Sequence, residues 1–76
     1  MSEATFKFRF WTGPTQVEDV LWWLNWCNRF EAQAGTEHVY GTVRLPDNGQ
    51  PAQEFAALAK GVLGYDPGFA CLEKFS

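Results

Sequence analysis

The sequence predicts a small α+β protein, a two-layer sandwich in the order β-α-β-α-β, with a three-stranded sheet and both helices on one face. A chain of 76 residues suffices for one domain, which we place at 1–76. Four breaks marked by Gly, Pro, Asn or Asp divide the chain into five elements. The apolar spacing along these elements alternates between two and about 3.6 residues, which indicates strands and helices in turn.

The first element, residues 4–11, alternates between two kinds of side chain, as a half-buried strand does. One face holds Phe6, Phe8 and Phe10, and the other holds Lys7, Arg9 and Trp11. The predicted helices are expected to cover the phenylalanine face, which leaves the other face open to solvent.

The second element is a predicted helix that begins near Thr15 and ends at Ala34, before Gly35. Thr15 and Glu18 have the spacing of a capping box, in which each side chain bonds the other residue's amide. Gly35 is a natural helix stop, because glycine adopts left-handed backbone angles without strain. One arc of this helix is apolar and predicts a core face: Val17, Val20, Trp23, Leu24, Cys27, Phe30 and Ala34.

The third element, residues 37–45, is a second predicted strand. Val39, Val43 and Leu45 share one face, and His38, Tyr40, Thr42 and Arg44 share the other. Gly41 interrupts this pattern and indicates a bulge or the close approach of another backbone.

The fourth element, residues 51–64, is a predicted helix with Pro51 in its first turn and Gly64 at its end. Its apolar residues recur at helical spacing: Phe55, Leu58, Ala59, Val62 and Leu63. The fifth element, residues 68–75, is a short predicted strand that is partly apolar on both faces, so its orientation stays open.

Three tryptophans lie within five positions, at Trp22, Trp23 and Trp26. A helix separates them, because Trp23 falls on the core arc whereas Trp22 and Trp26 fall opposite it, one turn apart. Two hypotheses remain for that pair: either this chain covers them, or they form a partner-binding surface rimmed by Asp19, Arg29 and Gln33. Exposed apolar patches with polar rims mark contact sites, and Trp and Arg dominate interface energies.

The open face of the sheet is a second candidate surface, because it would present Lys7, Arg9, Trp11, Tyr40 and Arg44 together, with the acidic residues elsewhere. Aromatic residues interleaved with Lys and Arg are typical of sheets that bind single-stranded nucleic acid. However, the segment FKFRFW lacks the glycines of the RNA-recognition motif, and the predicted element order differs from that of such domains. A solvated strand face is therefore the competing interpretation.

The sequence shows no motif for catalysis, for a metal ion or for a cofactor, so we expect none of the three. His38 has no serine or cysteine at catalytic spacing, and Cys27, His38 and Cys71 lack the spacing of a zinc site. Glu18 and Asp19 are adjacent on a helix, so they complement its dipole instead of forming an acid–base pair.

No signal peptide and no membrane-spanning stretch is recognisable in the sequence, which favours the cytoplasm. Both cysteines are then expected as reduced thiols, buried as small apolar side chains, with a disulfide or a reactive thiol as the alternatives. The net charge of −3 favours solubility and argues mildly against nonspecific binding to DNA.

These observations favour a non-enzymatic domain that binds another protein, or itself as a homodimer. In size, acidity and lack of motif, the chain is similar to small accessory proteins of phages and mobile elements, which include inhibitors of bacterial defence complexes. This resemblance of profile implies a domain that binds and inhibits a larger bacterial protein complex. Binding of single-stranded nucleic acid through the open sheet face is the alternative.

Overall fold

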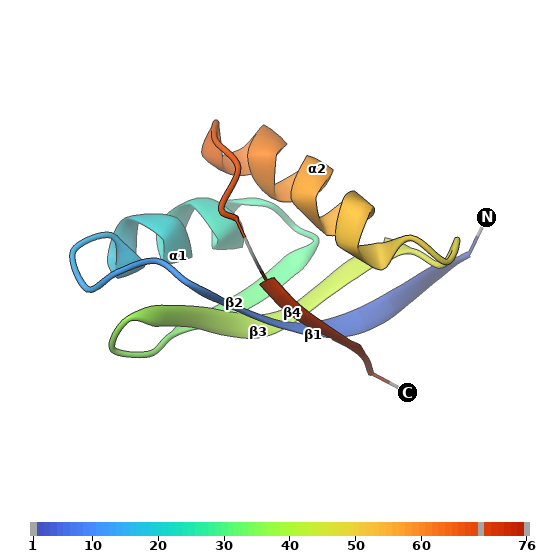
Figure 1. The fold of residues 1–76 in the computed structure, drawn as a ribbon, viewed down its shortest axis with the longest axis horizontal. Coiled ribbons are helices and arrows are strands. Elements are labelled where there is room, and N and C mark those ends of the chain that lie inside the picture. Colours follow the sequence, from blue (N-terminus) through green and yellow to red (C-terminus); the bar gives the residue numbers. More distant parts are fainter. Residues whose placement is uncertain (1, 69, 76) are drawn as a thin grey trace.

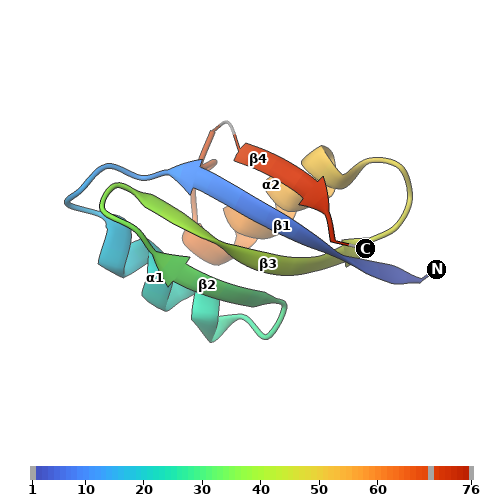
Figure 2. The same cartoon turned by 90° about the horizontal axis from the view of Figure 1, so that it is seen from below.

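The computed structural model describes residues 2–68 and 70–75. They form, in order, β1 (Glu3–Trp11), α1 (Val17–Trp26), β2 (Phe30–Ala34), β3 (His38–Pro46), α2 (Pro51–Leu63) and β4 (Ala70–Lys74). All strand pairs are antiparallel, and the strands lie side by side in the order β2-β3-β1-β4. Both helices cover one face of this sheet (Figure 1). Figure 2 shows the opposite face of the sheet, which no helix covers.

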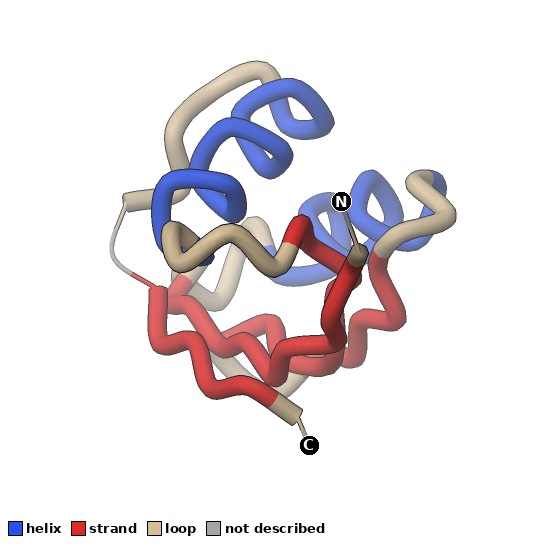
Figure 3. The backbone as a smooth tube through the Cα atoms, turned by 90° about the vertical axis from the view of Figure 1, so that its right-hand side faces the viewer, coloured by secondary structure: helices blue, strands red, loops and turns tan. Residues whose placement is uncertain are grey.

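The predicted α+β class is confirmed, but the predicted number of strands is wrong. The sheet has four strands instead of three, and the element order is β-α-β-β-α-β. The predicted helix 15–34 is two elements, because α1 ends at Trp26 and residues 30–34 form β2. This connectivity, with β3 lying between β1 and β2, is that of a split β-α-β sandwich. Figure 3 shows its two layers, with the helices on one side and the strands on the other.

The chain leaves α1 at Cys27, which has an extended backbone with φ −89° and ψ 125°. Three residues later Phe30 enters the core, with its ring centroid 5.6 Å from that of Phe8 and 6.1 Å from that of Phe55. The spacing of Phe30 and Ala34 fits a helix, but the alternation of FEAQA fits a strand equally well. Pairing with β3 and contact with these two rings favour the strand.

Asn25, near the end of α1, stabilises the same arrangement. Its Oδ1 accepts a hydrogen bond from the Ala32 amide at 2.9 Å, and its Nδ2 donates to the Ala32 carbonyl at 3.0 Å. These backbone groups belong to β2, an edge strand of the sheet, and they are the groups that an added strand would need. We call this pair of hydrogen bonds the Asn25 clasp.

The core lies between the sheet and the helices, and it contains the predicted inward positions of β1 and β3. All six of these side chains are at most 5% exposed: Phe6, Phe8, Phe10, Val39, Val43 and Leu45. The helices add a smaller buried set, namely Val17, Val20, Leu24, Phe55 and Ala59. The buried aromatic rings meet edge-on or tilted more often than stacked, an arrangement that aromatic pairs favour.

The helix ends agree with the sequence at α2 but not at α1. Pro51 lies in the first turn of α2, and Gly64 has the left-handed conformation at its end, both as predicted. The predicted capping box of Thr15 is wrong, because Gln16 holds the N-cap of α1 and no side chain bonds the first amides there. Neither helix among the described residues is long and apolar enough to cross a membrane.

Gly41 marks the predicted close approach of two backbones. It pairs with Ala32 of β2, and a Cβ atom at this position would lie 1.9 Å from the carbonyl oxygen of Glu31. Its φ of 152° also lies in a region that other residues rarely adopt. Only glycine therefore lets β2 lie this close to β3.

Replacing Gly41 with alanine is expected to lower the free energy of unfolding by about 2–4 kcal/mol, because the new methyl group meets backbone and the dihedral is strained. Chemical unfolding followed by circular dichroism measures this loss. Gly61→Ala in α2 is the matched control. Open space surrounds Gly61 on a helix, so alanine there is expected to stabilise by about 0.5–1 kcal/mol. Equal effects at the two glycines would contradict the close approach.

Candidate functional site

Trp22, Trp23 and Trp26 are exposed on α1, and we call them the tryptophan ridge. Their exposed fractions are 58%, 47% and 73%. The rings of Trp22 and Trp26 stack with 5.6 Å between centroids and 18° between planes. Trp23 meets Trp22 edge-on at 4.9 Å. Of the two hypotheses for Trp22 and Trp26, the structure therefore supports exposure.

The prediction that Trp23 belongs to the core is wrong. Because α1 is shorter than predicted, its buried face is narrow and holds Val17, Val20 and Leu24. Trp23 lies at the flank of this face, where it lines a shallow depression with Leu63 and Tyr65 at the end of α2. The third tryptophan thus enlarges the exposed aromatic surface instead of the core.

Two acidic side chains border the ridge. Residues three and four positions apart share a helix face, so Asp19 lies beside Trp22 and Trp23, and Glu18 lies beside Trp22. Both carboxylates are exposed in the first turn of α1. Asp19 was predicted as a rim residue. Glu18 was missed in that role, although its spacing of four from Trp22 is visible in the sequence.

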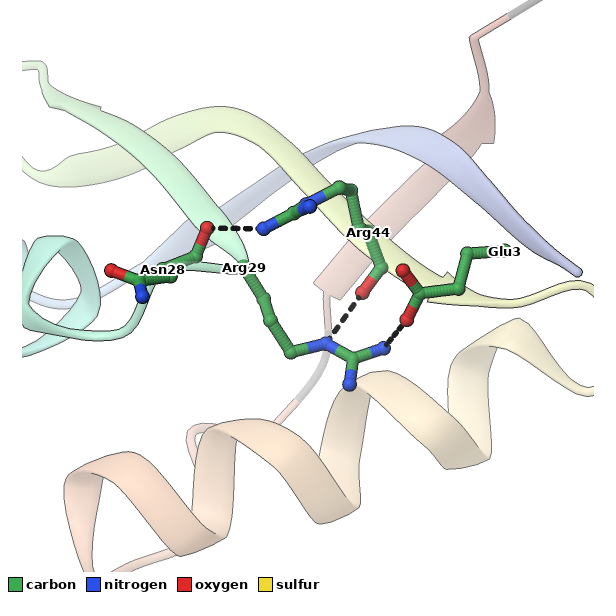
Figure 4. Close-up of polar contacts among 4 residues, drawn as sticks. All are labelled: Glu3, Asn28, Arg29 and Arg44. Atoms are coloured by element: carbon green, nitrogen blue, oxygen red, sulfur yellow. Dashed lines mark hydrogen bonds and ion pairs between the residues drawn. The ribbon is translucent and has the colours of Figure 1, made fainter.

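Arg29 is not a rim residue, because it follows α1 instead of extending it. Its Nε donates to the Arg44 carbonyl at 3.0 Å, and its Nη2 forms an ion pair with Glu3 (Figure 4). In return, the Arg44 Nη2 donates to the Asn28 carbonyl at 2.7 Å. These contacts fix the turn before β2 to β3 and to the start of β1, so the prediction for Arg29 is wrong.

Gln33 is also absent from the rim. It lies on β2, and its Oε1 accepts a hydrogen bond from the Tyr40 hydroxyl at 3.3 Å across the sheet. Both errors have one cause, since a helix extended to Ala34 would have carried Arg29 and Gln33 beside the tryptophans.

The open sheet face brings together the predicted nucleic-acid candidates Lys7, Arg9, Trp11, Tyr40 and Arg44. In the register of β1 and β3, Arg9 lies opposite Tyr40, and Trp11 lies opposite His38. Trp11 is 61% exposed and Tyr40 is 42% exposed. The Lys7 Nζ atom lies 5.2 Å from the ring centroid of Phe75, a third exposed aromatic residue beside β1.

Acidic residues share this face, so the expectation that they lie elsewhere is wrong. Glu31 lies on the edge strand β2, opposite Thr42 of β3. Glu73 lies on the other edge strand, β4, opposite Lys7 of β1. Neither position was predictable, because β2 was hidden in the predicted helix and the last strand had no assigned orientation. The two carboxylates weaken the positive potential that the arginines and Lys7 create.

Both cysteines are free thiols. Cys27 is partly buried against the core as predicted, whereas the prediction of burial is wrong for Cys71, which is exposed on β4. Cys71 and His38 border one open depression, but β1 lies between their strands, which separates the two backbones by about 9–10 Å. Within residues 2–68 and 70–75, no cluster of His, Cys, Asp and Glu is arranged to hold a metal ion.

No family model, no curated protein and no solved structure matches this chain.

Replacing Trp22 and Trp26 together with alanine is expected to lower the free energy of unfolding by about 1 kcal/mol or less, because exposed side chains contribute little to stability. Leu24→Ala on the buried face of the same helix is expected to cost about 2–5 kcal/mol. Urea unfolding of the three proteins compares these values. A loss in the double variant as large as that of Leu24→Ala would contradict the exposure of the ridge.

Proposed function

We propose that this chain is a non-enzymatic protein-interaction domain that binds a larger protein through the tryptophan ridge. The observation that carries the proposal is the exposed, stacked pair of Trp22 and Trp26. The buried face of α1 already packs on the sheet, so these rings are not needed for the core. Tryptophan is the residue type most enriched at the energetic centre of protein interfaces.

The size of the ridge supports this role. At the exposures given above, three tryptophans present roughly 400 Å² of largely apolar surface, since a whole side chain carries about 250 Å². Removing that area from water contributes about 10 kcal/mol, while association itself costs about 4–15 kcal/mol. The ridge is therefore large enough for the centre of an interface, and the surrounding polar residues must supply the rest.

The proposed consequence of binding is inhibition. A small domain with a rigid aromatic face can cover a working surface of a larger complex without any chemistry of its own. The accessory proteins of phages and mobile elements, which this chain resembles in size, acidity and lack of motif, include inhibitors of bacterial defence complexes. We place the interaction in the cytoplasm, where both thiols stay reduced.

The test is affinity capture from bacterial extracts with the wild-type chain, followed by measurement of the affinity for the captured protein. Trp22→Ala/Trp26→Ala is expected to weaken binding by about 30-fold or more, because the loss of even one hot-spot tryptophan costs about 2 kcal/mol or more. Gln53→Ala, at an exposed position on α2, is the matched control and is expected to bind as the wild type does. Unchanged affinity in the folded tryptophan variant would refute the proposal.

Binding of single-stranded nucleic acid by the open sheet face is a second candidate function. Its support is that a four-stranded sheet, free of helices on one face, carries exposed Trp11 and Tyr40 beside Arg9. RNA-recognition sheets of four strands stack bases on aromatic residues in this way. With four strands, the sheet no longer differs in strand number from that of RNA-recognition domains. Glu31 and Glu73 on the same face weigh against the candidate.

Fluorescence anisotropy with a labelled single-stranded oligonucleotide tests this candidate. If Lys7, Arg9 and Arg44 contact phosphates, affinity is expected to fall about tenfold or more when the salt concentration rises fourfold. Arg9→Ala/Trp11→Ala is expected to abolish binding, and Lys60→Ala on α2 serves as the charge control. Absence of binding at low salt removes the candidate.

A further inference from the structure

The charged residues of α1 beside the tryptophan ridge have one sign. Glu18 and Asp19 lie one turn before the tryptophans on the same helix face, and the last turn of α1 carries no basic residue. The helix dipole is equivalent to about half a positive charge at the N-terminus of α1 and about half a negative charge at its C-terminus. At the N-terminus, the two negative charges of Glu18 and Asp19 exceed this positive half-charge. The ridge is thus bordered by negative potential at both ends.

The basic residues of this chain are engaged or lie elsewhere. The two ion pairs among the described residues are Arg29 with Glu3 and Lys74 with Asp47, and neither involves a carboxylate beside the ridge. The strand register assigns Lys7, Arg9 and Arg44 to the opposite face of the molecule. The sixth base, Lys60, lies exposed in the last turn of α2 and forms no ion pair with a described residue. Glu18 and Asp19 are therefore available to form ion pairs with basic residues of a partner.

We infer that the ridge binds a basic protein segment, in which Lys or Arg side chains lie over the tryptophan rings and pair with Glu18 and Asp19. This inference rests on the proposed function and specifies the chemistry of its partner. Tryptophan is the aromatic side chain that attracts cations most strongly, and arginine also stacks on its face. The nearly parallel rings of Trp22 and Trp26 present such faces beside the carboxylates.

A second copy of this chain fits the ridge less well. Each copy has a net charge of −3 and would bring two more carboxylates to the interface. The nearest base after α1, Arg29, already bonds Glu3 and the Arg44 carbonyl. A homodimer through the ridges would leave the acidic border without opposite charge.

The probe for this inference is a library of random peptides selected on the wild-type chain, with peptides that also bind Trp22→Ala/Trp26→Ala removed. The peptides that remain need the ridge, and they are expected to contain Lys and Arg at several times the library frequency. Glu18→Gln/Asp19→Asn is expected to weaken their binding about tenfold. Glu31→Gln/Glu73→Gln changes the net charge equally on the open sheet face and is expected to leave their binding unchanged.

The outcomes separate the two proposals. Ridge-dependent peptides without basic enrichment, or equal losses in both charge variants, would overturn the basic partner and leave the interaction domain standing. An absence of ridge-dependent peptides would count against both. Sedimentation that shows a dimer, lost in Trp22→Ala/Trp26→Ala, would assign the ridge to a second copy and overturn the inference.

Discussion

The rings of Phe8, Phe30 and Phe55 meet in the core from one strand, a second strand and a helix, and much of the structure depends on this contact. Phe30 reaches it as a residue of β2, which requires α1 to end before Cys27. The early end of α1 narrows its buried face and leaves the tryptophans outside. The short strand that follows carries Glu31 and Gln33 to the far side of the sheet. A single packing requirement therefore shapes both surfaces of the molecule.

The two layers of the fold also differ in the charges that they present to solvent. The helical layer presents aromatic residues with an acidic border, and the sheet presents aromatic residues among charges of both signs. Electrostatic complementarity steers association and selects among partners more than it adds affinity. The two faces are thus suited to partners of different charge, although they lie on a chain of only 76 residues.

Local pattern was sufficient for the elements whose period is unambiguous. Phe6, Phe8 and Phe10, and likewise Val43 and Leu45, follow a strand repeat that no helix satisfies, and each is buried. In contrast, the five residues from Phe30 to Ala34 fit either period, and the choice depends on rings distant in sequence. Asn25 and Asn28 disfavour a helix, but that signal is weak beside a continuous apolar arc.

The error in the length of this helix also changed the candidate site. Trp22, Trp26 and Asp19 lie on α1, as predicted. The predicted positions of Trp23, Arg29 and Gln33 were wrong because they assumed a helix that continued to Ala34.

The Asn25 clasp bears on how copies of this protein can associate. Ala32 has both backbone groups bonded to Asn25, and the Phe30 amide donates to the Cys27 carbonyl, so the outer side of β2 is largely satisfied within the chain. Growth of a continuous sheet through many molecules requires each molecule to accept a strand on two sides. With one side closed, edge-to-edge pairing through β4 would end at two copies. The Asn25 side chain and the turn at Cys27 therefore oppose growth of a continuous sheet through the β2 edge.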